Sequence, residues 1–236
     1  MADTSVKFTG ENFIPELSEK RLKDDHVERY RFAATVVRGA KVLDIACGPG
    51  YGSQILLDAG AVSVDGADIS EKMVAHARQT HRDPRIRFQV GDICTFRGEA
   101  PYDFITCFET IEHLPQYREA IANLYTLLKP GGRLYISSPN RTITTPDARS
   151  IEDKPRNEFH TQEFTMEELK ALLEERGFKI ARDGVYGQRF QRHFRSGWMR
   201  KLYRMAFRPE SKSSPSILAL GNLPPRYFLI VAQIPG

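Results

Sequence analysis

The stretch CFETIEHL, residues 107–114, holds two carboxylates and an imidazole close together: Glu109, Glu112 and His113. An imidazole titrates near neutral pH, so His113 can remove a proton from a substrate, with Glu109 beside it. The same groups can bind a divalent metal ion, and a mixed carboxylate and imidazole set suits Mn²⁺ or Co²⁺ better than Mg²⁺. If the chain turns helical here, the three side chains share one face. A structural role, in which the glutamates cap backbone amides and His113 packs, is the third interpretation.

The elements that position this stretch alternate between short β-branched runs and helical patterns, which predicts β-α-β units and a parallel sheet. We expect strands at residues 41–46, 62–67, 86–90, 104–108 and 134–138, with helices between them at 52–59, 71–80 and 117–128. A capping-box pattern at 165–168 opens a further helix, which Gly177 ends. Two last strands are expected at 178–185 and 227–234.

Two long segments, 139–162 and 186–225, lack regular apolar periodicity. Long irregular insertions in a compact domain usually serve a site. We therefore expect lid insertions at about 139–163 and 186–225 within a main domain of residues 41–236. Residues 1–40 are expected to add an N-terminal helical lid segment.

The composition is that of one ordinary globular domain, with 236 residues, 41% hydrophobic and 27% charged. No run approaches the roughly 18 apolar residues that span a bilayer, and the N-terminus lacks the apolar stretch of a secretory signal, so we expect a cytoplasmic protein. The three cysteines form no Cys-x-x-Cys pair, and we expect neither a disulfide nor a zinc site. The net charge of +4 is too small to indicate a nucleic-acid-binding protein.

A glycine-rich loop follows the first predicted strand in VLDIACGPGYGS, residues 42–53. Glycines let backbone amides approach a ligand closely. Ser53 occupies the third glycine position of a dinucleotide-binding loop, and the charge of Asp44 would repel a pyrophosphate but suit an ammonium group. The loop therefore favours a nucleoside ligand. Asp68 and Asp92 end the next two strands, where they can accept hydrogen bonds from ribose hydroxyls and an adenine amine.

Five motifs in order resemble the class I methyltransferases that use S-adenosylmethionine: VLDIACGPGYGS, GADIS, VGDI, YDFITCFETIEHL and LLKPGGRLYISSPN, between residues 41 and 138 and just beyond. The resemblance implies a Rossmann-like, seven-stranded, mostly parallel sheet with an antiparallel last strand and helices on both faces. It implies S-adenosylmethionine as the cofactor and S-adenosylhomocysteine as its product. The residues expected to bind the cofactor are Asp44, Ala46, Cys47, Gly48, Gly50, Asp68, Ile69, Met73, Gly91, Asp92, Ile93, Phe108 and Glu109.

Within that resemblance, the ExxEH arrangement and a later histidine resemble the ubiquinone-biosynthesis O-methyltransferases and the enzymes that 2′-O-methylate small RNAs at the 3′ end. The RNA enzymes bind a divalent ion with two glutamates and two histidines. Glu109, Glu112, His113 and His160 match that set by type and order. A metal-free site, with His113 as the base, is the interpretation we favour. The candidate substrate-contacting residues are Asn140, Arg141, His160 and Tyr30.

Residues 189–208 hold seven Lys and Arg and no Asp or Glu, with aromatic residues at helical spacing. Such a segment can contact an anionic membrane surface or RNA phosphates, or it can cover the site with its arginines in water. The expected function is O-methylation of a small hydroxylated metabolite such as a phenol, a sugar or a natural-product intermediate. The alternatives are metal-assisted methylation of an RNA end, a membrane-associated quinone-precursor methyltransferase, and a catalytically silent S-adenosylmethionine-binding subunit. The sequence indicates no oligomeric state.

Overall fold

The computed structural model describes residues 20–190 and 216–236. In this part of the chain eight strands form one sheet in the order β3-β2-β1-β4-β5-β8-β6-β7. The parallel strands are β1 (Lys41–Ile45), β2 (Ser63–Asp68), β3 (Ile86–Val90), β4 (Tyr102–Phe108) and β5 (Leu128–Pro139). β8 (Pro225–Gln233) runs antiparallel to both of its neighbours, β5 and β6 (Lys179–Phe190), and the short β7 (Leu218–Ala219) pairs with the far edge of β6. The predicted fold class is confirmed, although β7 adds an eighth strand.

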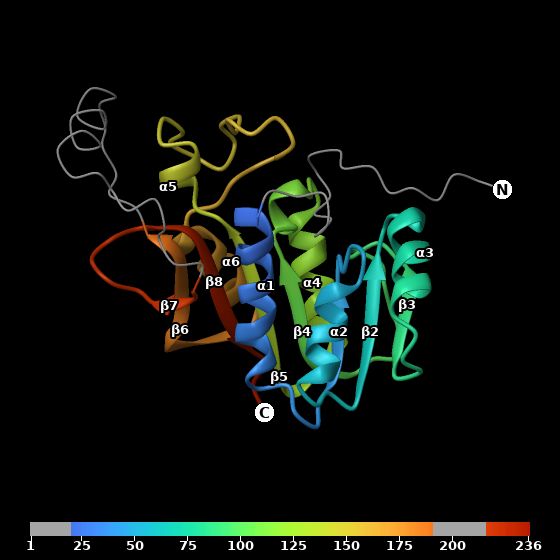
Figure 1. Cartoon of the computed structure of the whole chain (residues 1–236). Coiled ribbons are helices and arrows are strands. Elements are labelled where there is room, and N and C mark those ends of the chain that lie inside the picture. Colours follow the sequence, from blue (N-terminus) through green and yellow to red (C-terminus); the bar gives the residue numbers. More distant parts are fainter. Residues whose placement is uncertain (1–19, 191–215) are drawn as a thin grey trace.

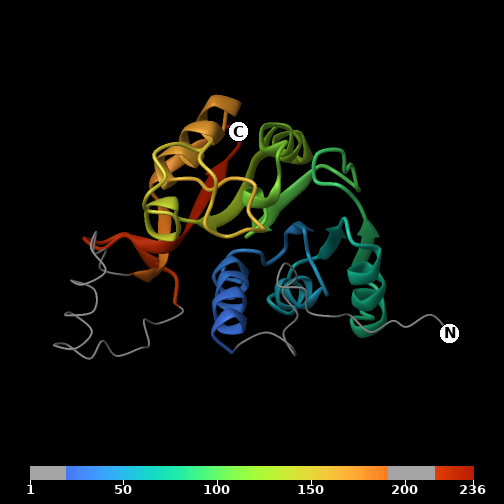
Figure 2. The same cartoon turned by 90° about the horizontal axis from the view of Figure 1, so that it is seen from above.

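Helices cover both faces of the sheet. The helices α1 (Lys20–Ala34), α2 (Tyr51–Asp58) and α3 (Glu71–Thr80) lie on one face, and α4 (Tyr117–Leu127) and α6 (Met166–Arg176) lie on the other (Figure 2). Each face has its own apolar core, one containing Leu56 and Val74 and the other Leu124 and Leu173. The central strands β1 and β4 are almost completely buried and mostly apolar, which is why their sequence predicts them well.

The residues at both ends of α6 form the caps that the sequence predicts. Thr165 accepts a hydrogen bond from the amide of Glu168, and the Glu168 side chain accepts one from the amide of Thr165, which completes the capping box. Gly177 ends the helix with a φ of 110°, in the left-handed region that glycine adopts without strain. This helix starts and stops where the sequence predicts.

Three features differ from the prediction. β6 continues to Phe190 instead of ending at residue 185, because it pairs with β8 as far as Pro225. β5 begins at Leu128, directly after α4. The irregular segment after β5 contains one short helix, α5 (Arg141–Thr144), and lies above the carboxyl ends of the parallel strands (Figure 1). None of the described helices is long and apolar enough to cross a membrane.

Of the basic segment 189–208, only Arg189 and Phe190 belong to the described residues. Both are part of β6, whereas the spacing predicts a helix there. The Arg189 side chain is buried and lies 2.6 Å from the Asp25 carboxylate, so it does not face water as expected. The membrane and RNA hypotheses for the rest of this segment fall outside the described residues.

Candidate functional site

The glycine-rich loop between β1 and α2 bends through three residues in the left-handed region. Ala46 has a φ of 57°, Gly48 of 54° and Gly50 of 85°. A Cβ atom added at Gly48 would meet no atom within 4 Å, so this side of the loop faces open space. At Gly50 an added Cβ would lie 2.6 Å from the Phe88 ring, which fixes the residue as glycine. The loop therefore offers bare backbone to a ligand at the carboxyl edge of the sheet.

Asp68, at the end of β2, is joined to this loop. Its Oδ2 atom accepts a hydrogen bond of 2.8 Å from the Gly48 amide, and its Oδ1 atom accepts one of 2.9 Å from the Ser70 amide. The carboxylate is partly exposed, and burial raises its pKa above the ordinary value. The structure thus brings together two of the predicted cofactor-binding positions that lie 20 residues apart.

An exposed apolar edge lies beside the ends of β2 and β3. The side chains of Ile69 and Val90 are 71% and 48% exposed at these neighbouring strand ends. Asp92 follows β3 and is exposed, with its Oδ1 atom accepting a hydrogen bond from the Cys94 amide. Apolar side chains beside two carboxylates suit a flat base and its ribose. Other expected cofactor residues have buried side chains: Cys47, Met73, Ile93 and Phe108.

Asp44 is fully buried at the end of β1. Its carboxylate accepts hydrogen bonds from the hydroxyls of Tyr30 at 3.0 Å, Ser53 at 2.7 Å and Thr106 at 2.8 Å. Burial raises its pKa to about 6, against the opposing effect of these three hydrogen bonds. The predicted contact with a ligand ammonium is not supported by this arrangement, because the carboxylate is engaged inside the protein. Asp44 ties together α1, β1, α2 and β4.

Tyr30, a candidate substrate residue, belongs to the same internal network. A Cβ atom added at Gly52 would lie 2.1 Å from the Tyr30 ring, so the absence of a side chain at Gly52 makes room for it. The ring also meets Phe108 edge to face, with centroids 5.1 Å apart. Tyr30 is 5% exposed and anchors α1 to the sheet.

Glu109, Glu112 and His113 do not share one helical face. Glu109 has a φ of 47° directly after β4, and only Ile111–His113 form a short 3₁₀ helix, η1. Glu109 accepts a hydrogen bond of 2.7 Å from the Ser137 hydroxyl and lies 3.5 Å from a guanidinium nitrogen of Arg29. The turn therefore separates Glu109 from Glu112 and His113.

His113 is held in a defined tautomer. Its Nδ1 atom lies 2.9 Å from the carbonyl oxygen of Phe159, and because a carbonyl only accepts hydrogen bonds, Nδ1 carries the proton. In the neutral ring the lone pair is then on Nε2, which lies 4.0 Å from Oε1 of Glu112. The side chain is 33% exposed.

Glu112 is buried, at 1% exposure, and its Oε2 atom has no hydrogen-bond partner within residues 20–190 and 216–236. Burial and the nearby Glu109 charge raise the pKa of Glu112 well above its ordinary value. A buried carboxyl oxygen without a partner is costly, so a bound ion, a water or a catalytic role is needed to explain it.

His160 comes from the irregular segment after β5, and its ring meets that of His113. Its Nδ1 atom lies 2.7 Å from Oε1 of Glu163, and its Nε2 atom lies 2.8 Å from the side-chain nitrogen of Asn157. The other Glu163 oxygen accepts hydrogen bonds from the hydroxyls of Thr144 and Thr145. Although burial opposes it, hydrogen bonding to His160 and to these hydroxyls lowers the pKa of Glu163.

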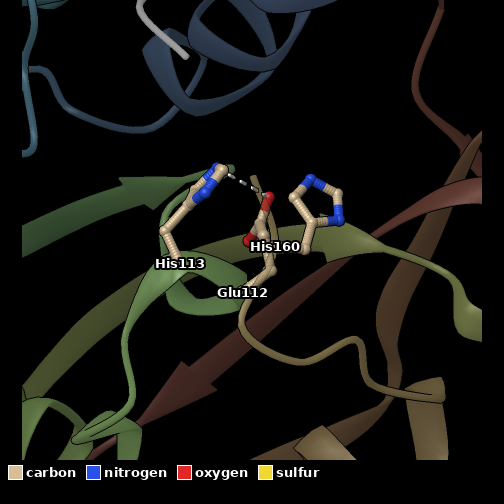
Figure 3. Close-up of side chains that lie close together, drawn as sticks. All are labelled: Glu112, His113 and His160. Carbon is tan, nitrogen blue, oxygen red and sulfur yellow. Dashed lines mark ion pairs between the residues drawn. The ribbon is translucent and has the colours of Figure 1, made fainter. Parts of the chain in front are cut away.

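Glu112, His113 and His160 together form a candidate metal-ligating group (Figure 3). One ligand atom from each lies within 4.8 Å of the others. Glu109, the fourth member of the predicted set, is not part of this group. The structure therefore supports three of the four predicted ligands as neighbours.

Asn140 and Arg141 are buried where the sequence predicts substrate contact. The Asn140 side chain caps α5 and donates a hydrogen bond to the Pro225 carbonyl oxygen. Arg141 donates to the Glu163 carbonyl oxygen and to the Glu168 carboxylate, at 2.6 Å. Both side chains fasten the segment after β5 to α6 and β8, so the geometry gives them a structural role.

The sheet order, with Gly48, Asp68 and Asp92 at its carboxyl edge and a polar cluster after β4, is that of a class I S-adenosylmethionine-dependent methyltransferase. The sequence model of the methyltransferase-domain family matches residues 18–182. The chain belongs to this family of enzymes.

Relatives agree with the assignment. A probable S-adenosylmethionine-dependent methyltransferase of Mycolicibacterium smegmatis is 35% identical over 179 residues, which cover 75% of this chain and 67% of the relative. A ubiquinone biosynthesis O-methyltransferase of Coxiella burnetii is 39% identical over 112 residues, covering 45% of this chain and 47% of the relative. The N-methyltransferase NodS of Bradyrhizobium japonicum, solved with S-adenosylhomocysteine, has a TM-score of 0.62 at 18% identity over 93% of this chain and 90% of its own. At that identity the likeness concerns the fold alone.

No motif or spacing in the sequence predicts two residues of the site, Arg29 and Glu163. Arg29 lies on α1, within the segment expected only to add a helical lid, and Glu163 lies at the end of the first expected lid insertion. Both are buried charged residues, at 1% exposure, which the sequence alone does not distinguish from solvent-facing ones.

Proposed function

We propose that the protein transfers a methyl group from S-adenosylmethionine to a hydroxyl of a small metabolite, with His113 as the general base. The observation that carries this proposal is the hydrogen bond from Nδ1 of His113 to the Phe159 carbonyl oxygen. It leaves the basic nitrogen of a partly exposed imidazole beside the carboxyl edge of the sheet. A hydroxyl acceptor must lose its proton during transfer, and an imidazole is suited to accept it near neutral pH.

The residues at the carboxyl edge fit the cofactor. Gly48 offers backbone without a side chain, Asp68 is placed to accept hydrogen bonds from ribose hydroxyls, and Asp92 is placed near the base. When bound, S-adenosylmethionine supplies a methyl group already activated by its sulfonium. The protein then has to position the acceptor, keep water out and receive one proton.

A small-molecule acceptor is the partner most consistent with the chain. The similarity to the Coxiella burnetii ubiquinone biosynthesis O-methyltransferase supports oxygen as the methylated atom, although it covers 45% of this chain. Arg189 is engaged in a buried ion pair with Asp25. This arginine of the basic segment 189–208 is therefore not available to an RNA or membrane partner. A small hydroxylated metabolite therefore remains the first candidate.

The test is transfer of labelled methyl from S-adenosylmethionine into three separate pools, namely water-soluble metabolites, lipid extract and small RNA. We expect label in the soluble pool. Label confined to RNA or to lipid would contradict the proposal and favour an RNA-end or quinone-precursor enzyme. Cofactor binding without transfer to any pool would indicate a silent subunit.

A metal-assisted reaction is the second candidate, and the unpartnered Oε2 atom of buried Glu112 favours it. A divalent cation held by Glu112, His113 and His160 would give this oxygen a partner, and Glu163 and the Phe159 carbonyl would orient the two imidazoles from behind. Such an ion would supply Lewis-acid polarisation of the acceptor hydroxyl.

Mn²⁺ binding, measured by calorimetry, separates the two candidates. If the metal site exists, the protein binds Mn²⁺ and Glu112→Gln weakens this binding strongly. The control Glu167→Gln, at an exposed glutamate, leaves Mn²⁺ binding unaltered. Activity that survives chelation and gains nothing from added Mn²⁺ would argue for the metal-free base.

A further inference from the structure

Asn157 lies in the turn that carries His160 and makes three hydrogen bonds there. Its side-chain oxygen Oδ1 accepts a hydrogen bond of 3.1 Å from the Phe159 amide, and its main-chain carbonyl oxygen accepts one of 3.2 Å from the His160 amide. Its side-chain nitrogen Nδ2 lies 2.8 Å from Nε2 of His160. Because a backbone N–H only donates, the Phe159 amide fixes which side-chain atom is the oxygen. Nδ2 is therefore the atom that faces the His160 ring.

This arrangement determines the tautomer of the His160 ring. A side-chain amide nitrogen only donates hydrogen bonds, so Nε2 of His160 is the acceptor of this bond. The ring proton is then on Nδ1, where the Glu163 carboxylate accepts it at 2.7 Å. The protein itself thus engages both ring nitrogens, and the lone pair of Nε2 points at an N–H of Asn157.

A divalent cation at this cluster would need the same lone pair. An imidazole ligates a metal ion through an unprotonated ring nitrogen, and in His160 that nitrogen is Nε2. The Asn157 N–H already uses this lone pair and presents the positive end of its dipole there. A cation must therefore displace Asn157 before His160 joins Glu112 and His113 as a ligand. The hydrogen bond that is lost weakens the binding of the cation.

We propose that Asn157 withholds the His160 lone pair from divalent cations and so favours the metal-free state of this cluster. Asn157 is a positioning residue, since it acts through the His160 ring. The inference rests on the proposed function, in which His113 receives the acceptor proton without a metal ion. With Glu163 on one ring nitrogen and Asn157 on the other, the His160 ring keeps its edge-to-face orientation against His113.

Mn²⁺ titration by calorimetry tests this without methyl transfer. The proteins are wild type, Asn157→Ala, Asn157→Asp and the control Asn222→Ala, at an exposed asparagine before β8. We expect Asn157→Ala to bind Mn²⁺ about 3- to 10-fold more tightly than wild type, because the competing hydrogen bond is gone. Asn222→Ala should bind Mn²⁺ as wild type does.

Asn157→Asp serves if the alanine variant does not fold. It keeps an oxygen that accepts from the Phe159 amide, it cannot donate to His160, and it adds a carboxylate ligand. We therefore expect it to bind Mn²⁺ at least as tightly as Asn157→Ala. Adding Glu112→Gln to Asn157→Ala should remove the gain in affinity, which locates the ion at this cluster.

A gain in affinity separates this role from a structural one, because a damaged turn would weaken metal binding. Nitrogen NMR of metal-free protein with ¹⁵N-labelled histidine gives a second reading. The Nε2 resonance of His160 should shift in Asn157→Ala, while the ring proton stays on Nδ1.

Mn²⁺ binding by the Asn157 variants that equals or falls below that of wild type would overturn the inference. A gain that survives Glu112→Gln would also overturn it, since the ion would then lie elsewhere. The proposed function fails in a different measurement, namely methyl transfer by wild type that stops when a chelator is added.

Discussion

The ring of His113 meets the ring of His160 edge to face, with centroids 5.0 Å apart and planes at 81°. The two residues lie on different segments, one after β4 and the other in the irregular stretch after β5. Each ring is held from behind through Nδ1, by the Phe159 carbonyl oxygen and by the Glu163 carboxylate. The pair therefore has a defined orientation, which a proton-accepting or a metal-binding site requires.

His113→Asn is expected to lower kcat by about 10²- to 10⁴-fold, because it removes the general base. The affinity for S-adenosylhomocysteine should not change, since His113 is not among the expected cofactor contacts. The control is His76→Asn, on α3, where the histidine ring contacts Thr80. Full activity of His113→Asn in a steady-state assay would exclude this role.

If the metal-assisted reaction applies, Glu163→Gln should lower kcat by about 10- to 100-fold, because Glu163 orients His160 as a ligand of the ion. The amide can keep one hydrogen bond to the His160 ring but brings no charge. We expect S-adenosylhomocysteine to bind as in wild type, as measured by calorimetry. Glu167→Gln, an exposed glutamate nearby, is the control, and equal activity of the two variants would show that Glu163 does not position the site.

Asp68→Ala is expected to abolish measurable binding of S-adenosylmethionine in calorimetry. Asp68 joins the glycine-rich loop to β2 through the Gly48 amide and offers the carboxylate for the ribose. The reference is Asp83→Ala, an acidic residue after α3 that pairs with Arg85. Unchanged affinity in Asp68→Ala would place the nucleoside elsewhere.

Asp44 should make the protein less stable as pH rises. Its pKa is about 6 in the folded protein and 3.8 ordinarily, so between these values the folded state binds more protons than the unfolded state. The free energy of unfolding therefore falls through this window, by about 3 kcal/mol from this group alone. Asp44→Asn cannot titrate, so the difference in unfolding free energy between wild type and variant should change with pH. Parallel curves from urea unfolding at about pH 4 and about pH 7 would contradict this.

Gly52→Ala should destabilise the protein by about 1–3 kcal/mol, because the new methyl group overlaps the Tyr30 ring. An ideal Cβ would lie 2.1 Å from that ring, so Tyr30 and its hydrogen bond to Asp44 must move. Gly221→Ala, where an added Cβ meets nothing within 4 Å, is the control in thermal unfolding. Equal melting temperatures would show that Tyr30 adapts at little cost.

The cofactor edge could be predicted from the sequence because parallel strands bring their carboxyl ends to one side. Asp68 ends β2 and Asp92 follows β3, so their nearness follows from the topology. The capping box of α6 is similarly local, and it lies where its pattern predicts. These features need only neighbouring residues and the sheet order.

The rest of the site depends on packing between distant segments. His160 meets His113 because the Thr161 amide and hydroxyl bond to the Glu112 carbonyl oxygen, at 49 residues of separation. Glu109 leaves the expected helical face because its backbone adopts a left-handed turn that a glutamate rarely uses. Asp44 lies inside the protein because three hydroxyls from separate elements reach it. No local pattern encodes these contacts.

The most direct measurement uses S-adenosylmethionine with a ¹³C-labelled methyl group, incubated with a soluble metabolite extract and either wild type or His113→Asn. Carbon NMR of the products identifies the atom that receives the label. We predict an oxygen-bound methyl group that forms with wild type and is strongly reduced with His113→Asn. A nitrogen- or carbon-bound methyl group, or oxygen methylation that proceeds equally well without His113, would contradict the proposed function.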